Sequence, residues 1–214
     1  MDRAVISRRS FLLAAAAAGA AGIINTPTTA LADGSHQFEP SIELTVEATP
    51  CNENAEPCLT RIKEHSTTFD QLRMSGESEL TVEILPPSRA SSNGARRTTS
   101  SSYSDPVAKI TIKATWTMST NKKKVNLSKV IVTFTQKGGE ITKRGVIAWN
   151  NDLFIKRDPA GLKCTIEPTW GYLPYYAGNE GISHQITAWG KATPSGMSGS
   201  TTDISCKLTY GCYA

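Results

Sequence analysis

The sequence lacks the motifs that identify the common cofactor sites. It contains no glycine-rich phosphate-binding loop and no dinucleotide fingerprint, which removes the usual sequence basis for nucleotide chemistry. It has no CxxC, HxH or HExxH spacing, and only three histidines stand in its 214 residues. We therefore predict no metal site and no cofactor.

Charge of one sign is also scarce. The chain has 23 basic and 19 acidic residues, a net charge of +4. Residues 1–32 hold three of the arginines and one aspartate, so the remainder carries only +2. The only basic triplet, Lys122–Lys124, lies between two strand-like runs and reads as a solvated turn, with a contact to anionic cell-wall polymer as the alternative. This balance argues against a nucleic-acid partner.

Long apolar runs are limited to one near the N-terminus. The run from Phe11 to Ile24 is 14 residues long, shorter than a bilayer requires but typical of a signal segment. Before it, Arg8 and Arg9 stand in the stretch Ser-Arg-Arg-Ser-Phe-Leu, which resembles the twin-arginine export motif. Small residues ending at Ala32 supply a cleavage pattern. An uncleaved anchor is the alternative.

The resemblance implies a bacterial protein that the twin-arginine machinery exports. Residues 1–32 are then a cleaved signal peptide, and the mature protein is secreted or extracytoplasmic, with no stable membrane anchor after cleavage. An exported chain meets oxidising conditions, in which disulfides are the default state of cysteine. We predict two bridges, Cys51–Cys58 across a short loop and Cys164–Cys206 between inward strand positions. Cys212 has the same parity as Cys206 and competes for the same partner, and we favour the arrangement in which Cys212 is the free thiol.

Strand-type alternation of apolar and polar residues dominates the rest of the chain. It recurs, with β-branched residues and with turn residues between the runs, at 42–48, 79–84, 108–118, 130–134, 162–166, 182–188 and 204–210. Many short strands separated by turns predict an all-β fold, an antiparallel β-sandwich of immunoglobulin-like size. The segment from Leu59 to Leu72 fits a helix or a strand equally well.

The predicted organisation has four parts. After the signal come an N-terminal β segment at 33–85, a Ser/Arg/Pro-rich linker or disordered loop at 86–106, and the main β-sandwich at 107–214. The linker either joins a separate small unit to the main domain or is a long loop within one sandwich; we favour one sandwich. Arg96 and Arg97 within it form a candidate protease site.

Aromatic residues are few, 7% of the chain, yet four fall within seven residues. These are Trp170, Tyr172, Tyr175 and Tyr176, broken by Gly171 and Pro174 and therefore in a loop. Aromatic faces with polar edges suit protein partners and sugar rings, so we predict a binding site here. The alternative is that the rings cap one end of the sandwich as a minor core.

Candidate catalytic groups are weaker. Two of the four carboxylates Glu167, Asp152, Asp158 and Glu180 could form the pair of a glycosidase if they faced each other across a cleft. His184 has inward parity, so it is either a hydrogen-bonded core residue or the base of a thiol–imidazole pair. Gly-Met-Ser-Gly-Ser around Ser198 lacks the final glycine of a nucleophile elbow and predicts a turn.

These patterns favour a non-enzymatic, secreted binding module for a surface glycan or protein. The alternatives are a cell-envelope hydrolase, with acidic residues near the aromatic loop, and a secreted toxin or bacteriocin-like factor processed at Arg96–Arg97.

Overall fold

The computed structural model describes residues 44–51, 56–87, 106–174 and 184–211 of the chain. The described part is all-β, apart from one short 3-10 turn. In chain order the elements are β1 (Leu44–Pro50), β2 (Leu59–Asp70), β3 (Ser75–Leu85), β4 (Ala108–Met118), β5 (Lys124–Gln136), β6 (Gly139–Asn150), β7 (Leu153–Arg157), β8 (Lys163–Ile166), β9 (Leu173–Pro174), β10 (Gln185–Pro194), η2 (Ser198–Ser200) and β11 (Thr202–Thr209).

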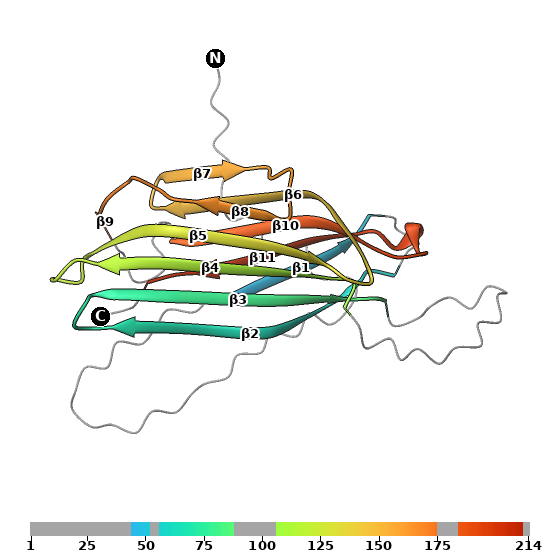
Figure 1. Ribbon diagram of the computed structural model, residues 1–214, viewed down its shortest axis with the longest axis horizontal. Coiled ribbons are helices and arrows are strands. Elements are labelled where there is room, and N and C mark those ends of the chain that lie inside the picture. Colours follow the sequence, from blue (N-terminus) through green and yellow to red (C-terminus); the bar gives the residue numbers. More distant parts are fainter. Residues whose placement is uncertain (1–43, 52–55, 88–105, 175–183, 212–214) are drawn as a thin grey trace, which may run out of the picture. The chain divides into compact units, whose positions relative to one another are not determined.

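The strands form two antiparallel sheets that pack together as a β-sandwich (Figure 1). The β1 sheet has the order β1-β11-β10-β6-β7, and the β2 sheet has the order β2-β3-β4-β5-β8, with β9 paired to β5. The prediction of an antiparallel β-sandwich is confirmed. Among the described residues, no helix has the length and apolar character needed to cross a membrane.

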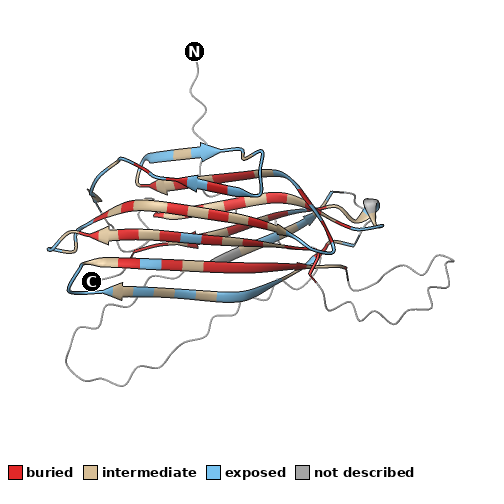
Figure 2. Ribbon diagram, in the orientation of Figure 1, coloured by how far each residue is buried: buried red, intermediate tan, exposed pale blue. Residues whose placement is uncertain are grey.

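Alternation along the strands creates the core. In β4 every second residue is buried, and β10 repeats this pattern from Ile186 to Pro194, because successive side chains point to opposite faces of a sheet. Figure 2 shows this banding of buried and less buried residues along the strands of both sheets. The largest fully buried side chains include Trp116, Tyr210 and Phe134. Alternate residues that do not enter the core form the two outer faces.

The segment for which helix and strand were equally expected is strand β2. Its half-buried residues alternate with exposed ones from His65 to Asp70, and Thr67 and Thr68 favour the extended backbone. A turn follows in which Asp70 Oδ1 accepts hydrogen bonds from the backbone N–H groups of Leu72 and Arg73. The ladder to β3 is irregular at one point, where the register shifts between Ile62 and Glu64.

Strands from both predicted β segments share the two sheets. β1, from residues 33–85, pairs with β11 at the other end of the chain, and β3 pairs with β4. The predicted signal at residues 1–32 lies outside the described residues, as do Arg96–Arg97 and most of the 86–106 segment.

Candidate binding surface

The predicted aromatic loop divides into residues with different surroundings. Trp170 is partly buried and packs against the hydrophobic core, as the end-cap alternative requires. Gly171 then takes a positive φ of 71°, and Tyr172 is 49% exposed. Tyr175 and Tyr176 lie outside the described residues. Of the four predicted binding residues, Tyr172 is thus the one that the structure describes as well exposed.

A second group of aromatic side chains lies on the outer face of the β1 sheet. Trp149 of β6 is directly opposite Phe154 of β7, and their ring centroids are 4.7 Å apart. Trp189 of β10 is opposite Gly145 of β6, and a Cβ atom added to Gly145 would overlap the indole ring. Lys156 Nζ lies 5.7 Å from the centroid of the Trp189 ring. We call this surface, formed by Gly145, Ile147, Trp149, Phe154, Lys156 and Trp189, the aromatic face.

Strand parity explains why these rings point outward. The buried neighbours Ala188 and Gly190 flank Trp189 on β10, so Trp189 takes the opposite side of the sheet. Trp149 likewise lies between the buried residues Ala148 and Asn150. Phe154 is 54% exposed. Sequence reasoning missed this surface because it searched for aromatic residues clustered along the chain. The sequence did contain a signal for it, because Trp189 is a large apolar residue at an outward position of a strand whose other apolar residues point inward.

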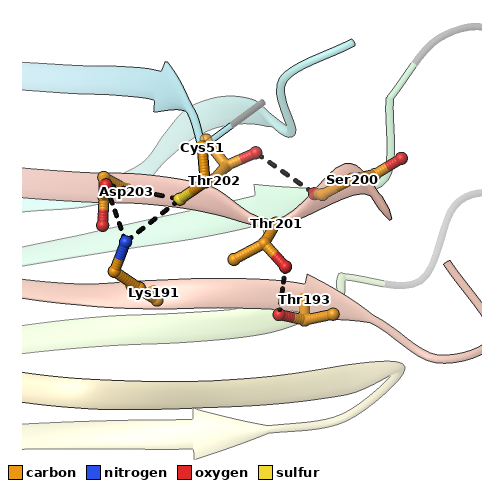
Figure 3. A network of polar contacts seen from close by, with 7 residues as sticks. All are labelled: Cys51, Lys191, Thr193, Ser200, Thr201, Thr202 and Asp203. Atoms are coloured by element: carbon orange, nitrogen blue, oxygen red, sulfur yellow. Dashed lines mark hydrogen bonds and ion pairs between the residues drawn. The ribbon is translucent and has the colours of Figure 1, made fainter. Parts of the chain in front are cut away.

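The exposed end of β1 brings a polar cluster together on the same outer face (Figure 3). Lys191 Nζ lies 3.2 Å from Cys51 Sγ and 3.1 Å from Asp203 Oδ2, and the Cys51 thiol lies 3.3 Å from that carboxylate oxygen. The hydrogen bonds that Lys191 donates to Cys51 and to Asp203 raise the pKa of Lys191, in that order of importance. The lysine is therefore held in its ammonium form.

The described cysteines are free thiols, so the predicted bridges are not formed in this structure. Cys51 is exposed, whereas Cys58 is buried and its thiol donates to the Ser200 carbonyl over 3.7 Å. Cys58 N–H also donates to Thr202 Oγ1, and burial raises the pKa of the Cys58 thiol. The two sulfur atoms thus have separate hydrogen-bond partners. Cys212 lies outside the described residues.

The sheet order argues against the Cys164–Cys206 pair. Both residues are buried, as expected, but they belong to opposite sheets and to different ends of the strand order. Cys206 is on β11, which lies over β3, whereas Cys164 is on β8, three strands further along. Three strand spacings are roughly 14 Å, and a disulfide needs Cα atoms within about 7 Å. The strand parity of Cys164 and Cys206 predicted correctly that both side chains are buried, but parity does not show which strands are neighbours.

His184 is a core residue. Its ring packs edge-on against Tyr210, with ring centroids 5.8 Å apart, and burial lowers the pKa of His184 to about 4, opposed by a hydrogen bond to the Pro174 backbone. Burial also raises the pKa of the Cys206 thiol to about 12 and raises that of Cys164. These thiols are therefore protonated at neutral pH, which does not suit a thiol–imidazole nucleophile.

The candidate carboxylates that the structure describes, Glu167, Asp152 and Asp158, are exposed at the surface, and Glu180 lies outside the described residues. Glu167 is 63% exposed and pairs with Lys129 over 2.8 Å, and this hydrogen bond lowers the pKa of Glu167. A glycosidase general acid needs the opposite shift. Asp152 is exposed in the turn between β6 and β7. Ser198 lies in the 3-10 turn η2, whereas a nucleophile elbow requires a strand–turn–helix.

Among the described residues, the carboxylate that is buried belongs to Glu83, on the outer face of the β2 sheet. Lys109 Nζ approaches it to 2.6 Å, Lys63 Nζ to 3.6 Å, and Arg61 forms a further ion pair. The hydrogen bonds from Arg61 and Lys109 lower the pKa of Glu83 to about 2. A neighbouring pair, Lys113 with Glu79, continues this ladder across β3 and β4. Ion pairs between neighbouring strands thus occupy the outer face of the β2 sheet.

Two further features bear on the choice of site. A shallow depression of about 320 Å³ lies at the β2–β3 hairpin, lined in part by Phe69, Asp70 and Glu77 and by none of the predicted binding residues. Within residues 44–51, 56–87, 106–174 and 184–211, no group of three His, Cys, Asp or Glu side chains could hold a metal ion.

Comparison with known proteins gives no match to a protein-family model, to a curated protein or to a solved structure.

Proposed function

We propose that the protein is a non-enzymatic module that binds a surface glycan through the aromatic face. The proposal includes export through the N-terminal signal, cleavage after Ala32 and a mature sandwich of immunoglobulin-like size. The single observation that carries it is the position of Trp189, whose indole lies over Gly145 on the side of the sheet opposite the core. A ring in this position is available to a ligand.

The chemistry of the aromatic face suits sugar rings. A pyranose has C–H groups on its faces and hydroxyl groups around its rim, so it matches a flat ring bordered by hydrogen-bonding groups. The indoles of Trp149 and Trp189 supply the flat surfaces, and Lys156 and Thr187 supply polar groups beside them. Both lysine and threonine side chains donate hydrogen bonds to hydroxyl oxygens.

The spacing of the rings favours an extended ligand. Trp149 and Gly145, which lies beneath Trp189, are four residues apart on β6, and this separation is roughly 13 Å along the strand. Ile147 lies between them on the same face. Two aromatic positions separated in this way fit two sugar units of one chain.

The proposal is tested by mixing the purified protein with isolated bacterial cell walls, pelleting the walls and assaying both fractions. We expect protein in the pellet and no released sugar fragments in the supernatant. Soluble fragments would instead support the hydrolase, and growth inhibition that depends on cleavage near Arg96–Arg97 would support the toxin. Titration with soluble fragments prepared from the same walls then gives the affinity.

Matched variants locate the surface. Trp189→Ala should weaken binding about tenfold, which corresponds to the loss of about 1.4 kcal/mol of stacking energy. Tyr172→Ala is the control, because Tyr172 is an exposed aromatic residue in the predicted loop and lies outside the aromatic face. Retention of full affinity by Trp189→Ala, together with loss in Tyr172→Ala, would move the site to the loop and overturn the assignment to the aromatic face.

A further inference from the structure

The polar cluster at the end of β1 places an amine and a thiol at a separation that one oxygen atom can bridge. Lys191 Nζ lies 3.2 Å from Cys51 Sγ, and Asp203 Oδ2 lies within 3.3 Å of both atoms. Figure 3 shows the three side chains converging from β10, β11 and the residue after β1. Their chemistry is that of a nucleophilic thiol, an amine and a proton acceptor.

Backbone register fixes this arrangement. Lys191 is directly opposite Asp203 in the β10–β11 ladder, and Thr49 is opposite Asp203 in the β1–β11 ladder. The backbone N–H of Cys51 donates to the Thr201 carbonyl over 2.9 Å, which extends this ladder beyond Pro50. Cys51 is two residues beyond Thr49 and therefore points to the same outer face. The meeting of thiol and amine thus follows from strand pairing.

The cluster is accessible to small oxidants. Cys51 is exposed, and the Lys191 side chain is 29% and the Asp203 side chain 53% exposed. The competing thiol of Cys58 is buried and donates to the Ser200 carbonyl. Among the described residues, the other cysteines are all buried, so oxidation at Cys51 meets Lys191 before it meets another of these thiols.

We propose that dioxygen links Lys191 Nζ to Cys51 Sγ through a single oxygen atom, which makes this pair an oxidative modification site. The Cys51 thiol gives its proton to Asp203. The Lys191 ammonium loses two protons, one N–O and one O–S bond form, and the second oxygen atom leaves as water with those two protons. Nitrogen and sulfur each lose two electrons, and dioxygen gains four. Asp203 later releases its proton to solvent.

The link would join β1 to β10 across β11. Residues 51 and 191 are 140 positions apart, so the bond closes a long loop and restricts the unfolded chain. It would also hold β1, an edge strand, in its place in the sheet. Lys191 is two residues from Trp189 on the same face, so the oxidised form would stiffen the border of the aromatic face.

The test uses the full-length purified protein, reduced and then kept in air-saturated buffer. Intact mass spectrometry should show a gain of one oxygen atom and a loss of two hydrogen atoms. Digestion and fragment-ion sequencing should find the peptides of Cys51 and Lys191 joined, and a thiol reductant should separate them. The oxidised protein should have a higher Tm than the reduced protein.

Variants decide the assignment. Lys191→Met keeps the side-chain length without the amine and should abolish the product, whereas Lys207→Met, on the same sheet, should leave it unchanged. Cys58→Ala should also retain it, because the chemistry does not use that thiol. A disulfide from Cys51 to another cysteine, a direct S–N bond, Cys51 oxidised without a link, or an unmodified Cys51 would each overturn the proposal.

Discussion

In the part of the chain that the structure describes, a tryptophan lies over a glycine on the inner face of one sheet and again on the outer face of the other. Trp116 is opposite Gly76 and Trp189 is opposite Gly145, and in both pairs an added Cβ would overlap the indole. Trp116 is fully buried, stacks on Phe69 with ring centroids 5.4 Å apart, and donates to Ser78 Oγ over 3.1 Å.

The outer pair has a different environment. Trp189 stays partly exposed, and a flexible lysine, Lys156, lies over its ring. The same local geometry therefore serves core packing in one sheet and leaves a ring facing solvent in the other. Burial of the inner ring stabilises the fold directly, whereas the outer ring adds little to the core. Because Trp189 is partly exposed and Trp116 is fully buried, Trp189 is the ring that a ligand can reach.

Truncation of each tryptophan is the strongest test of this comparison. Trp116→Ala should lower the free energy of unfolding by about 3–5 kcal/mol, because a large cavity remains in the core. Trp189→Ala should lower it by less than about 1 kcal/mol. Urea unfolding of both variants measures the difference. A loss of similar size in the two variants would show that Trp189 is a packing residue and would break the comparison.

Adding a methyl group to Gly76 or to Gly145 tests the same difference between the two tryptophan environments with a smaller change in volume. Gly76→Ala should destabilise the fold by about 1–3 kcal/mol, because the buried Trp116 ring has no room to move. Gly145→Ala should cost less, since the partly exposed Trp189 ring can move outward, but this displacement should weaken glycan binding. Thermal unfolding and wall pelleting on the two variants report the two effects. Full binding by Gly145→Ala would argue against a fixed ring position.

The outer face of the β2 sheet sharpens the comparison, since it carries ion pairs where the β1 sheet carries aromatics. Glu83→Gln should lower the free energy of unfolding by about 1–3 kcal/mol at neutral pH and leave wall binding unchanged. Loss of wall binding by a folded Glu83→Gln protein would show that the two outer faces are not separate in function.

The pKa of Glu83 gives this prediction a pH dependence. Because that pKa is lowered to about 2 from 4.5, the unfolded state binds the proton first as the pH falls. The stabilisation is complete above about pH 5 and is lost as the pH falls toward 2, and urea midpoints should show this loss in the wild type but not in the variant. Equal pH profiles would contradict the assignment.

The smallest expected effect is at Lys156. Lys156→Met removes the ammonium over the Trp189 ring but keeps an apolar chain of similar length. Stability should change by less than about 0.5 kcal/mol, as for other surface substitutions, and affinity should fall two- to threefold if the ammonium donates to a sugar hydroxyl (about 0.5 kcal/mol). Unchanged or tighter binding would show that Lys156 only covers the ring.

Sequence reasoning predicted the class of fold well because period-2 alternation is a local property. The runs around Ile110 and Ile186 specified extended strands with one buried face, and both faces are as expected. The assignment of Leu59–Leu72 stayed open because the pairing that decides it, β2 with β3, depends on a partner strand. The alternation of apolar and polar residues shows which side chains are buried but not which strands are neighbours. For this reason it led to a predicted bridge between Cys206 and Cys164, which is not formed in this structure.

The candidate site was harder to predict for the same reason. The Trp170–Tyr176 loop was visible because its residues are neighbours in sequence. Trp149, Phe154 and Trp189 come together only when β6, β7 and β10 pair, and the contact of Cys51 with Lys191 spans 140 residues. Features that depend on non-local pairing do not leave a pattern in one stretch of chain.

The irregular edge of the β2 sheet has a consequence for behaviour at high local concentration. β2 is 12 residues long, and an exposed strand of that length could template the addition of another chain. The register shift between Ile62 and Glu64 interrupts its ladder, and the charged residues Arg61, Lys63 and Glu64 lie at this point. A second copy approaching this edge would meet an irregular strand and a group of charged side chains, both of which disfavour edge-to-edge pairing. Copies crowded together on a polymer surface would therefore stay separate instead of joining into a continuous sheet.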